Sequence, residues 1–240
     1  MDFGDVISSS WSAKQIVESA RVVDEHGLDF LLLTDHYMTP HSNESVDAWI
    51  ALAALATKTE RIRLGTCVTP IPFRPPQMLA KIVATVDQLF NGRVILGVGA
   101  GWHKPEFDAY SSWHEDRVRV AKTREGIQLI MKLWTSNEPF DFEGKHYRVK
   151  SAILEPKPVQ QPHPPLWFGT TGAYMLRLAK QYADGSVPPR ARRVYGSLSV
   201  RPHSVEGRFA KEKSERNQGN VQRDPRRDNK NGSQACRDGF

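Results

Sequence analysis

The dipeptide Asp35-His36 is the first place in this chain where side-chain types and position could support chemistry. It directly follows residues 28–34, a continuous apolar run typical of a buried strand. Histidine titrates near neutral pH and can give or take a proton. The alternative is that Asp35 caps the following turn and His36 only bonds a carbonyl. We take Asp35 and His36 as the candidate catalytic residues.

Two glycine-containing strings could bring backbone close to a ligand. Residues 97–101 read Gly-Val-Gly-Ala-Gly, which alone is only a weak signal of dinucleotide binding. Glycines after a strand also let backbone approach a planar ring or a phosphate. Trp102 could then wall a pocket, or simply pack on the loop at Pro105. Residues 169–172, Gly-Thr-Thr-Gly, precede a predicted helix and could bind an anion or merely cap that helix.

The cysteines and the remaining histidines give no sign of a disulfide framework or a metal site. The chain has two cysteines, Cys67 and Cys236, and Cys67 is most simply a structural cysteine in a strand. Three histidines lack the spacing of metal ligands: His103, His114 and His146. We therefore predict no metal site and a reducing, cytoplasmic location.

Strand-like and helical segments alternate along most of the chain. Helical patterns span residues 11–26, 48–57, 78–90, 117–134 and 174–182. Strand-like runs span residues 6–8, 28–34, 62–68, 94–98, 166–168 and 184–187. Serial βα units with right-handed crossovers favour a (β/α)₈ TIM barrel, here with about six units, over a doubly wound open sheet. The glycine string follows the fourth strand and not the first, which also favours the barrel.

Two regions depart from this alternation. Residues 138–150 alternate in polarity around Glu143-Gly144 and predict a hairpin inserted outside the barrel wall. From Arg190 onward lie 13 of the 33 Lys and Arg residues but only 6 of the 27 Asp and Glu residues. Residues 1–189 are therefore nearly neutral and predict one barrel domain. Residues 190–240 predict a basic tail of low hydrophobicity, either disordered or non-native.

Several short strings together resemble the luciferase-like monooxygenase superfamily over about residues 1–187. They are LTDH at 33–36, LGTCVT at 64–69, LAK at 79–81 with DQL at 87–89, GRVILGVGAGW at 92–102, PKPVQ at 156–160 and ADG at 183–185. Their order and spacing are far more specific than any one string. The resemblance implies a luciferase-like TIM barrel and an oxidoreductase that moves a hydride to or from a flavin or a deazaflavin.

The resemblance also implies roles for particular residues. His36 is expected to lie near the cofactor ring and the substrate. Cys67-Val68 corresponds to a non-proline cis peptide that deazaflavin-dependent members place against the back of the ring. Residues 100–102 match a cofactor-contact loop, and residues 169–172 match the position of the cofactor phosphate or ribityl chain. The implied cofactor-binding residues are Cys67, Val68, Ala100, Gly101, Trp102, Gly169, Thr170, Thr171 and Gly172.

The strand end at 66–69 and the loop at 99–102 look closer to the deazaflavin-dependent members than to those that use FMN. The predicted activity is therefore hydride transfer between coenzyme F420 and a small organic substrate, with FMN-dependent monooxygenation as the alternative. No stretch approaches the roughly 20 apolar residues that span a bilayer, so no membrane partner is expected.

An interpretation of a different class is a truncated, inactive barrel fragment, because family members continue well beyond the ADG string. Its basic tail would bind polyanions without specificity, and no specific nucleic-acid partner is expected. A six-stranded arc would have open edges and uncovered apolar faces, which predict a homo-oligomer or self-association.

Overall fold

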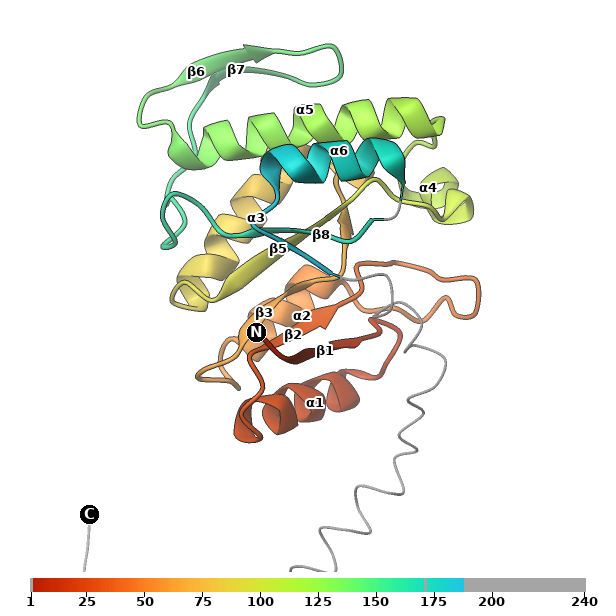
Figure 1. Cartoon of the computed structure of the whole chain (residues 1–240), viewed down its shortest axis with the longest axis vertical. Coiled ribbons are helices and arrows are strands. Elements are labelled where there is room, and N and C mark those ends of the chain that lie inside the picture. The colour runs from red at the N-terminus through yellow and green to blue at the C-terminus, as the bar shows by residue number, and fades with distance from the viewer. Residues whose placement is uncertain (1, 171, 188–240) are drawn as a thin grey trace, which may run out of the picture. The chain divides into compact units, whose positions relative to one another are not determined.

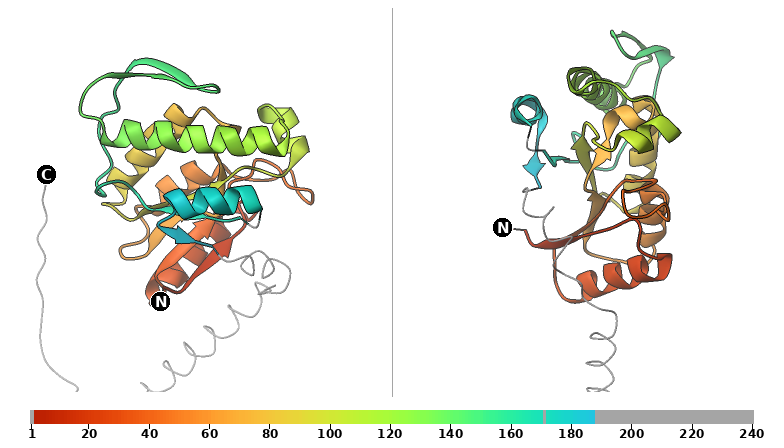
Figure 2. Two further views of the ribbon diagram at one scale, coloured as in Figure 1. Left: turned by 45° about the horizontal axis from the view of Figure 1, so that its top comes forward. Right: turned by 90° about the vertical axis from the view of Figure 1, so that its right-hand side faces the viewer.

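The computed structural model describes residues 2–170 and 172–187, and these form a parallel sheet with helices packed along it (Figures 1 and 2). Thr171 and the predicted basic tail, residues 190–240, lie outside the described residues.

The sheet follows chain order. Its strands, in spatial order, are β1 (Gly4–Ile7), β2 (Phe30–Leu33), β3 (Arg63–Thr66), β5 (Val94–Gly99), β8 (Leu166–Phe168) and β9 (Gly185–Ser186), and the short β4 (Thr69–Pro70) also pairs with β5. All of these pairings are parallel. A doubly wound sheet needs a reversal of strand order, and none occurs here. The sheet is therefore the arc of a barrel, as the sequence predicted.

Five helices begin and end within about two residues of the predicted positions. They are α1 (Ala13–Glu25), α2 (Ala48–Leu55), α3 (Pro76–Leu89), α5 (Asp116–Thr135) and α6 (Ala173–Tyr182). Their sequences contain clear start signals. Ser12 and Gln15 form a capping box at α1, and the Asp47 carboxylate accepts the Trp49 and Ile50 amides at α2. Residues 34–47, which carry Asp35 and His36, are thus held between β2 and a capped helix.

Two short helices were not predicted. The 3₁₀ helix η1 (Ile71–Phe73) and the helix α4 (Lys104–Tyr110) both follow strands at their carboxyl ends. Each is too short to show a helical period, and α4 buries only Glu106 and Phe107. α4 follows β5 and the glycine loop, which brings it to the carboxyl end of the strands (Figure 1). This helix supplies a site residue that the sequence analysis missed.

The predicted turn at Glu143-Gly144 joins β6 (Phe140–Glu143) to β7 (Arg148–Ala152) in an antiparallel pair. Figure 1 shows this hairpin on the far side of α5 from the main sheet. Glu125 of α5 holds its turn, because the carboxylate accepts the backbone amides of Lys145, His146 and Tyr147 at 3.1, 2.8 and 2.6 Å. The hairpin contributes no strand to the main sheet.

Gly97 is required where β5 and β3 meet. A Cβ atom at this position would lie 1.7 Å from the backbone oxygen of Thr66, which cannot rotate away as a flexible side chain could. We expect Gly97→Ala to lower the free energy of unfolding by at least about 1–3 kcal/mol, the usual cost of overpacking. Denaturant unfolding followed by circular dichroism measures this. Gly172→Ala is the control, because a Cβ there meets nothing within 4 Å, and a loss of similar size would refute the steric explanation.

Candidate active site

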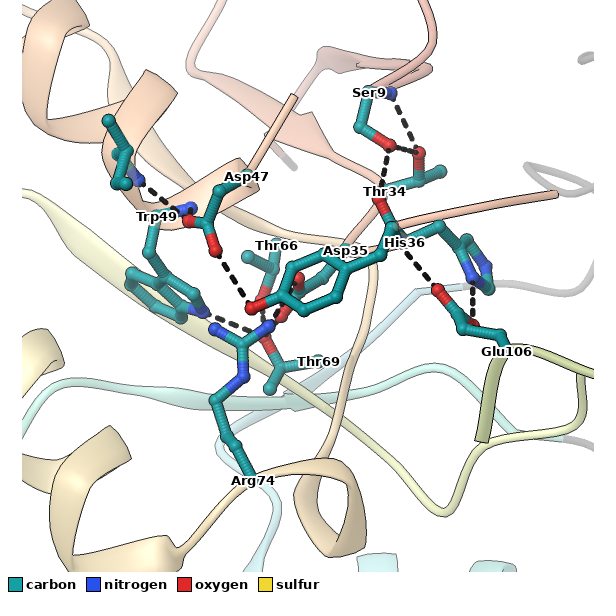
Figure 3. A network of polar contacts seen from close by, with 12 residues as sticks. Ser9, Thr34, Asp35, His36, Asp47, Trp49, Thr66, Thr69, Arg74 and Glu106 are labelled. Atoms are coloured by element: carbon teal, nitrogen blue, oxygen red, sulfur yellow. Dashed lines mark hydrogen bonds and ion pairs between the residues drawn. The ribbon is translucent and has the colours of Figure 1, made fainter. Parts of the chain in front are cut away.

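Asp35 and His36 lie at the carboxyl end of β2, the edge at which barrel enzymes place their active groups. The preceding Thr34 is tied to the loop after β1, since its hydroxyl accepts the Ser9 amide at 2.9 Å. The buried Ser9 hydroxyl also donates to the His36 carbonyl oxygen at 3.3 Å (Figure 3). Two strand ends therefore fix the backbone from which the His36 side chain projects.

The His36 ring is oriented by a buried carboxylate. Its Nδ1 lies 2.9 Å from Oε2 of Glu106, whose side chain is 1% exposed (Figure 3). A carboxylate can only accept, so Nδ1 carries the hydrogen and Nε2 is left with a lone pair in the neutral ring. Of the residues that the structure describes, none hydrogen-bonds Nε2. The simpler alternative was that the His36 ring bonds a carbonyl. The structure shows instead that the ring bonds the Glu106 carboxylate.

Glu106 was not among the predicted site residues. It lies in the first turn of α4, and its Oε1 accepts the backbone amide of Tyr37 at 2.6 Å and that of Met38 at 3.4 Å. One carboxylate therefore holds both the ring of His36 and the backbone that follows it. The only sequence signal was an acidic residue four positions after the glycine loop.

Trp102 stands beside His36 at the end of the glycine loop. The two rings meet edge to face with centroids 5.6 Å apart, and Trp102 is 52% exposed. Gly101 adopts a φ of 81°, a backbone conformation that favours glycine. A half-exposed indole next to a histidine can wall a ligand pocket, which was one of the two predicted uses of Trp102.

Asp35 is enclosed beneath this surface. It is 2% exposed, its Oδ1 accepts from Arg74 Nη2 at 2.8 Å, and its Oδ2 accepts from the Thr69 hydroxyl at 2.7 Å (Figure 3). Among the described residues only side chains donate to the two oxygens, so the alternative in which Asp35 caps the following turn is not what the structure shows. Burial raises the pKa of the Asp35 carboxyl, and the Arg74 charge and the Thr69 hydroxyl oppose that shift.

Arg74 completes the buried pair with Asp35. Burial lowers the pKa of Arg74, but the charges of Asp35, Tyr37 and Asp47 outweigh it and raise that pKa. Arg74 and a protonated Asp35 would leave an uncompensated buried cation, which is costly. We therefore assign the ionised form to both partners, in keeping with the short contact between them.

The peptide bond between Cys67 and Val68 is cis. Val68 lies against the ends of two neighbouring strands: a Cβ at Gly99 would meet its Cγ2 at 2.5 Å, and one at Gly169 would meet its Cγ1 at 2.6 Å. The absence of side chains at both glycines lets the segment between β3 and β4 approach β5 and β8. The structure thus brings Val68 together with one glycine of each predicted glycine string.

The second glycine string leads into α6. Gly172 is the N-cap residue of this helix, and its amide donates to the Thr170 hydroxyl at 3.3 Å. Thr170 is therefore not the cap, contrary to one of the alternatives, and Thr171 lies outside the described residues. The N-terminus of α6 remains able to offer amides to an anion.

Across residues 2–170 and 172–187, no group of three or more His, Cys, Asp or Glu side chains is arranged to hold a metal ion. In the same part of the chain, none of the helices is both long and apolar enough to cross a membrane.

The chain matches the family model described as luciferase-like monooxygenase over residues 3–216. An F420-dependent glucose-6-phosphate dehydrogenase of Nakamurella multipartita is 32% identical over 184 residues, which cover 75% of this chain and 53% of the relative. An FMNH2-dependent dimethylsulfone monooxygenase of Pseudomonas putida is 31% identical over 181 residues, covering 73% and 48%. The solved structure of an F420-dependent secondary alcohol dehydrogenase with an F420-acetone adduct has a TM-score of 0.70 at 28% identity, covering 78% and 58%.

The chain spans about half the length of the curated relatives it matches. The relatives are enzymes, and their names include both cofactors that the sequence predicted, F420 and FMN. The family match reaches past residue 187, the end of the resemblance recognised in the sequence. With the matching family model and the fold together, the chain belongs to the luciferase-like monooxygenase family.

Proposed function

We propose that this chain serves hydride transfer between coenzyme F420 and a small organic substrate. The observation that carries the proposal is the His36–Glu106 contact at the carboxyl ends of the strands, 2.9 Å long and almost closed to solvent on the glutamate side. Support comes from the relatives named as F420-dependent dehydrogenases, one by sequence and one by structure.

The residues at this edge fit a flat cofactor. Val68 presents a small apolar side chain between Gly99 and Gly169, and the backbone of both strand ends is bare at those glycines. We place the ring over Val68, with residues 99–102 along one border and the chain of the cofactor toward residues 169–172. When bound, a deazaflavin or flavin supplies the hydride chemistry, and the protein supplies binding, orientation and proton transfer.

His36 is the residue that exchanges a proton with the substrate. Oxidation of an alcohol to a carbonyl removes a hydride from carbon and a proton from oxygen, and the reverse reaction returns both. With the Nδ1 hydrogen held by Glu106, Nε2 can accept the hydroxyl proton and can return it. Trp102 stands beside the His36 ring, where its half-exposed indole would wall one side of the substrate site.

The second candidate is FMN-dependent monooxygenation, which the 31% identity to the Pseudomonas putida enzyme favours. Both activities would use the same strand ends, because the cofactor carries the difficult step in each. The two candidates therefore differ in the cofactor that binds and in the need for oxygen.

We further propose that residues 1–189 act as one domain in the cytoplasm, with a small molecule as their substrate. Among the described residues, β1 and β9 each pair on one side only. Such edges favour pairing with another chain, so we keep self-association as part of the proposal.

The proposal is tested by turnover of the full chain. We expect anaerobic spectral reduction of F420 when the chain is mixed with a substrate from a panel of secondary alcohols and sugar phosphates. His36→Ala should abolish most of that rate. Oxygen-dependent turnover with reduced FMN, together with no reaction of F420 on the whole panel, would contradict the proposal and favour the second candidate.

A further inference from the structure

Arg74 is a buried arginine that the proposed chemistry does not use. Its side chain is 12% exposed and lies beside the Tyr37 and Phe73 rings, with its guanidinium carbon 5.5 and 6.0 Å from their centroids. Its Nη2 bonds Asp35, while its buried Nε has no partner among the described residues. A buried ion pair is weak evidence for stability, because desolvation offsets much of the attraction. The pair therefore calls for another explanation.

The carboxylate of Asp35 joins two separate parts of the site. On one side Asp35 precedes His36 directly in the chain. On the other, its Oδ2 accepts the hydroxyl of Thr69, which follows the Cys67-Val68 segment by one residue. Thr69 is held in turn, because its Oγ1 accepts the indole hydrogen of Trp49 at 3.1 Å. The Asp35 carboxylate is therefore a side-chain link between His36 and the Val68 segment.

A second contact reinforces this connection. The backbone amide of Cys67 donates to the carbonyl of Leu33 at 2.7 Å, so the same segment is also tied to the end of β2 by main chain. Backbone and side-chain contacts therefore converge where β2 passes into Asp35-His36. Figure 3 shows Asp35, Thr69 and Arg74 meeting on one side of this strand end while His36 projects toward Glu106.

We propose that Arg74, acting through Asp35 and Thr69, is a positioning residue that fixes His36 relative to the Val68 segment. Asp35 is then also a positioning residue and does not touch the substrate. The inference rests on the proposed function insofar as the cofactor is placed over Val68. The positioning itself can be measured without any cofactor.

The test compares two partly buried arginines, Arg74 and Arg93. Arg74→Met removes the charge that pairs with Asp35 and keeps an unbranched side chain. Arg93→Met is the matched control, because Arg93 is also partly buried but bonds the carbonyls of Thr59, Ile62 and Phe90 near the amino ends of β3 and β5. Both variants should lower Tm. Only Arg74→Met should disturb the carboxyl edge of the sheet.

Cys67 reports directly on the segment in question. In a Cys236→Ser background it is the only cysteine of the chain. Its side chain is partly buried, so an increase in its rate of alkylation by iodoacetamide reports loosening of the segment. We expect Arg74→Met to raise that rate by about tenfold, as loss of a local anchor does. Arg74→Lys, which keeps the charge, should recover much of the wild-type rate. Arg93→Met should leave the alkylation rate unchanged when each variant is labelled at the same number of degrees below its own Tm.

Cofactor affinity is the second readout. Arg74→Met should weaken binding of F420, or of FMN if that is what the wild type binds, by about tenfold because the site is no longer pre-organised. Equal changes in Arg74→Met and Arg93→Met, or no change in Cys67 labelling with Arg74→Met, would overturn the inference. If the Cys67 labelling rates change as expected but the wild-type chain binds neither cofactor, the proposed function is refuted. The role of Arg74 would then be limited to anchoring residues 67–69.

Discussion

Replacing His36 with alanine is expected to lower kcat by about 10²- to 10⁴-fold, the usual contribution of a positioned acid or base. The ring has its Nδ1 hydrogen committed to Glu106, and its Nε2 is left for the substrate. Cofactor affinity should change little, because the backbone of residues 97–101 and the Val68 segment do not depend on the imidazole. The measurement is steady-state turnover beside a fluorescence titration of the cofactor with the same preparation.

The alternative for His36 is a purely structural role. In that case His36→Ala would lower Tm and leave kcat per folded molecule unchanged. His26→Ala is a suitable control, since His26 is the exposed C-cap residue of α1 and its ring bonds the Val22 carbonyl, far from the carboxyl ends of the strands. Equal kinetic effects of the two substitutions would contradict the assignment of His36.

Glu106→Gln is expected to have an effect of similar size. The amide can still accept the Tyr37 backbone hydrogen with its oxygen, but its NH₂ group then faces Nδ1 of His36. That arrangement forces the ring hydrogen onto Nε2, the wrong tautomer for accepting a substrate proton. The corresponding change of aspartate to asparagine beside the histidine of a serine-protease triad lowers kcat by about 10⁴-fold, and we expect about 10²- to 10⁴-fold here.

Glu106→Asp separates charge from geometry. It keeps a carboxylate but shortens its reach, so turnover should fall less than with glutamine. In Glu106→Gln, loss of the tautomer with its hydrogen on Nδ1 of His36 should act mainly on kcat, and KM should change less. If glutamine at this position retained wild-type kcat, the orienting role of Glu106 would be refuted.

The sequence predicted the order of the sheet because each strand is a short apolar run followed by a turn or glycine signal. β5 matches the strand predicted at residues 94–98 to within one residue, and it is buried along its whole length. The helices α1 and α2 were recognisable because their apolar residues recur at helical spacing. β4 was missed because it is a Thr-Pro pair without an apolar run of its own. The helices η1 and α4 were missed because three and seven residues are too few to show a helical period.

The site was only partly predictable, because its contacts join distant parts of the chain. His36 follows a strand and was recognisable from local sequence, whereas Glu106 reaches it from 70 residues away. Arg74 reaches Asp35 across 39 residues and carried no motif of its own. Local sequence shows which residues end a strand, but not which side chains meet across the barrel edge.

The most direct test of the proposed cofactor site is an equilibrium titration of the full chain with F420 and, separately, with FMN, followed by fluorescence. We predict saturable binding of F420, with FMN binding more weakly. We also predict that His36→Ala retains the F420 response, because the cofactor ring would be held by the strand ends and not by the imidazole. Tight binding of FMN with no response to F420 would contradict the proposed cofactor, and no response to either would contradict the proposed site.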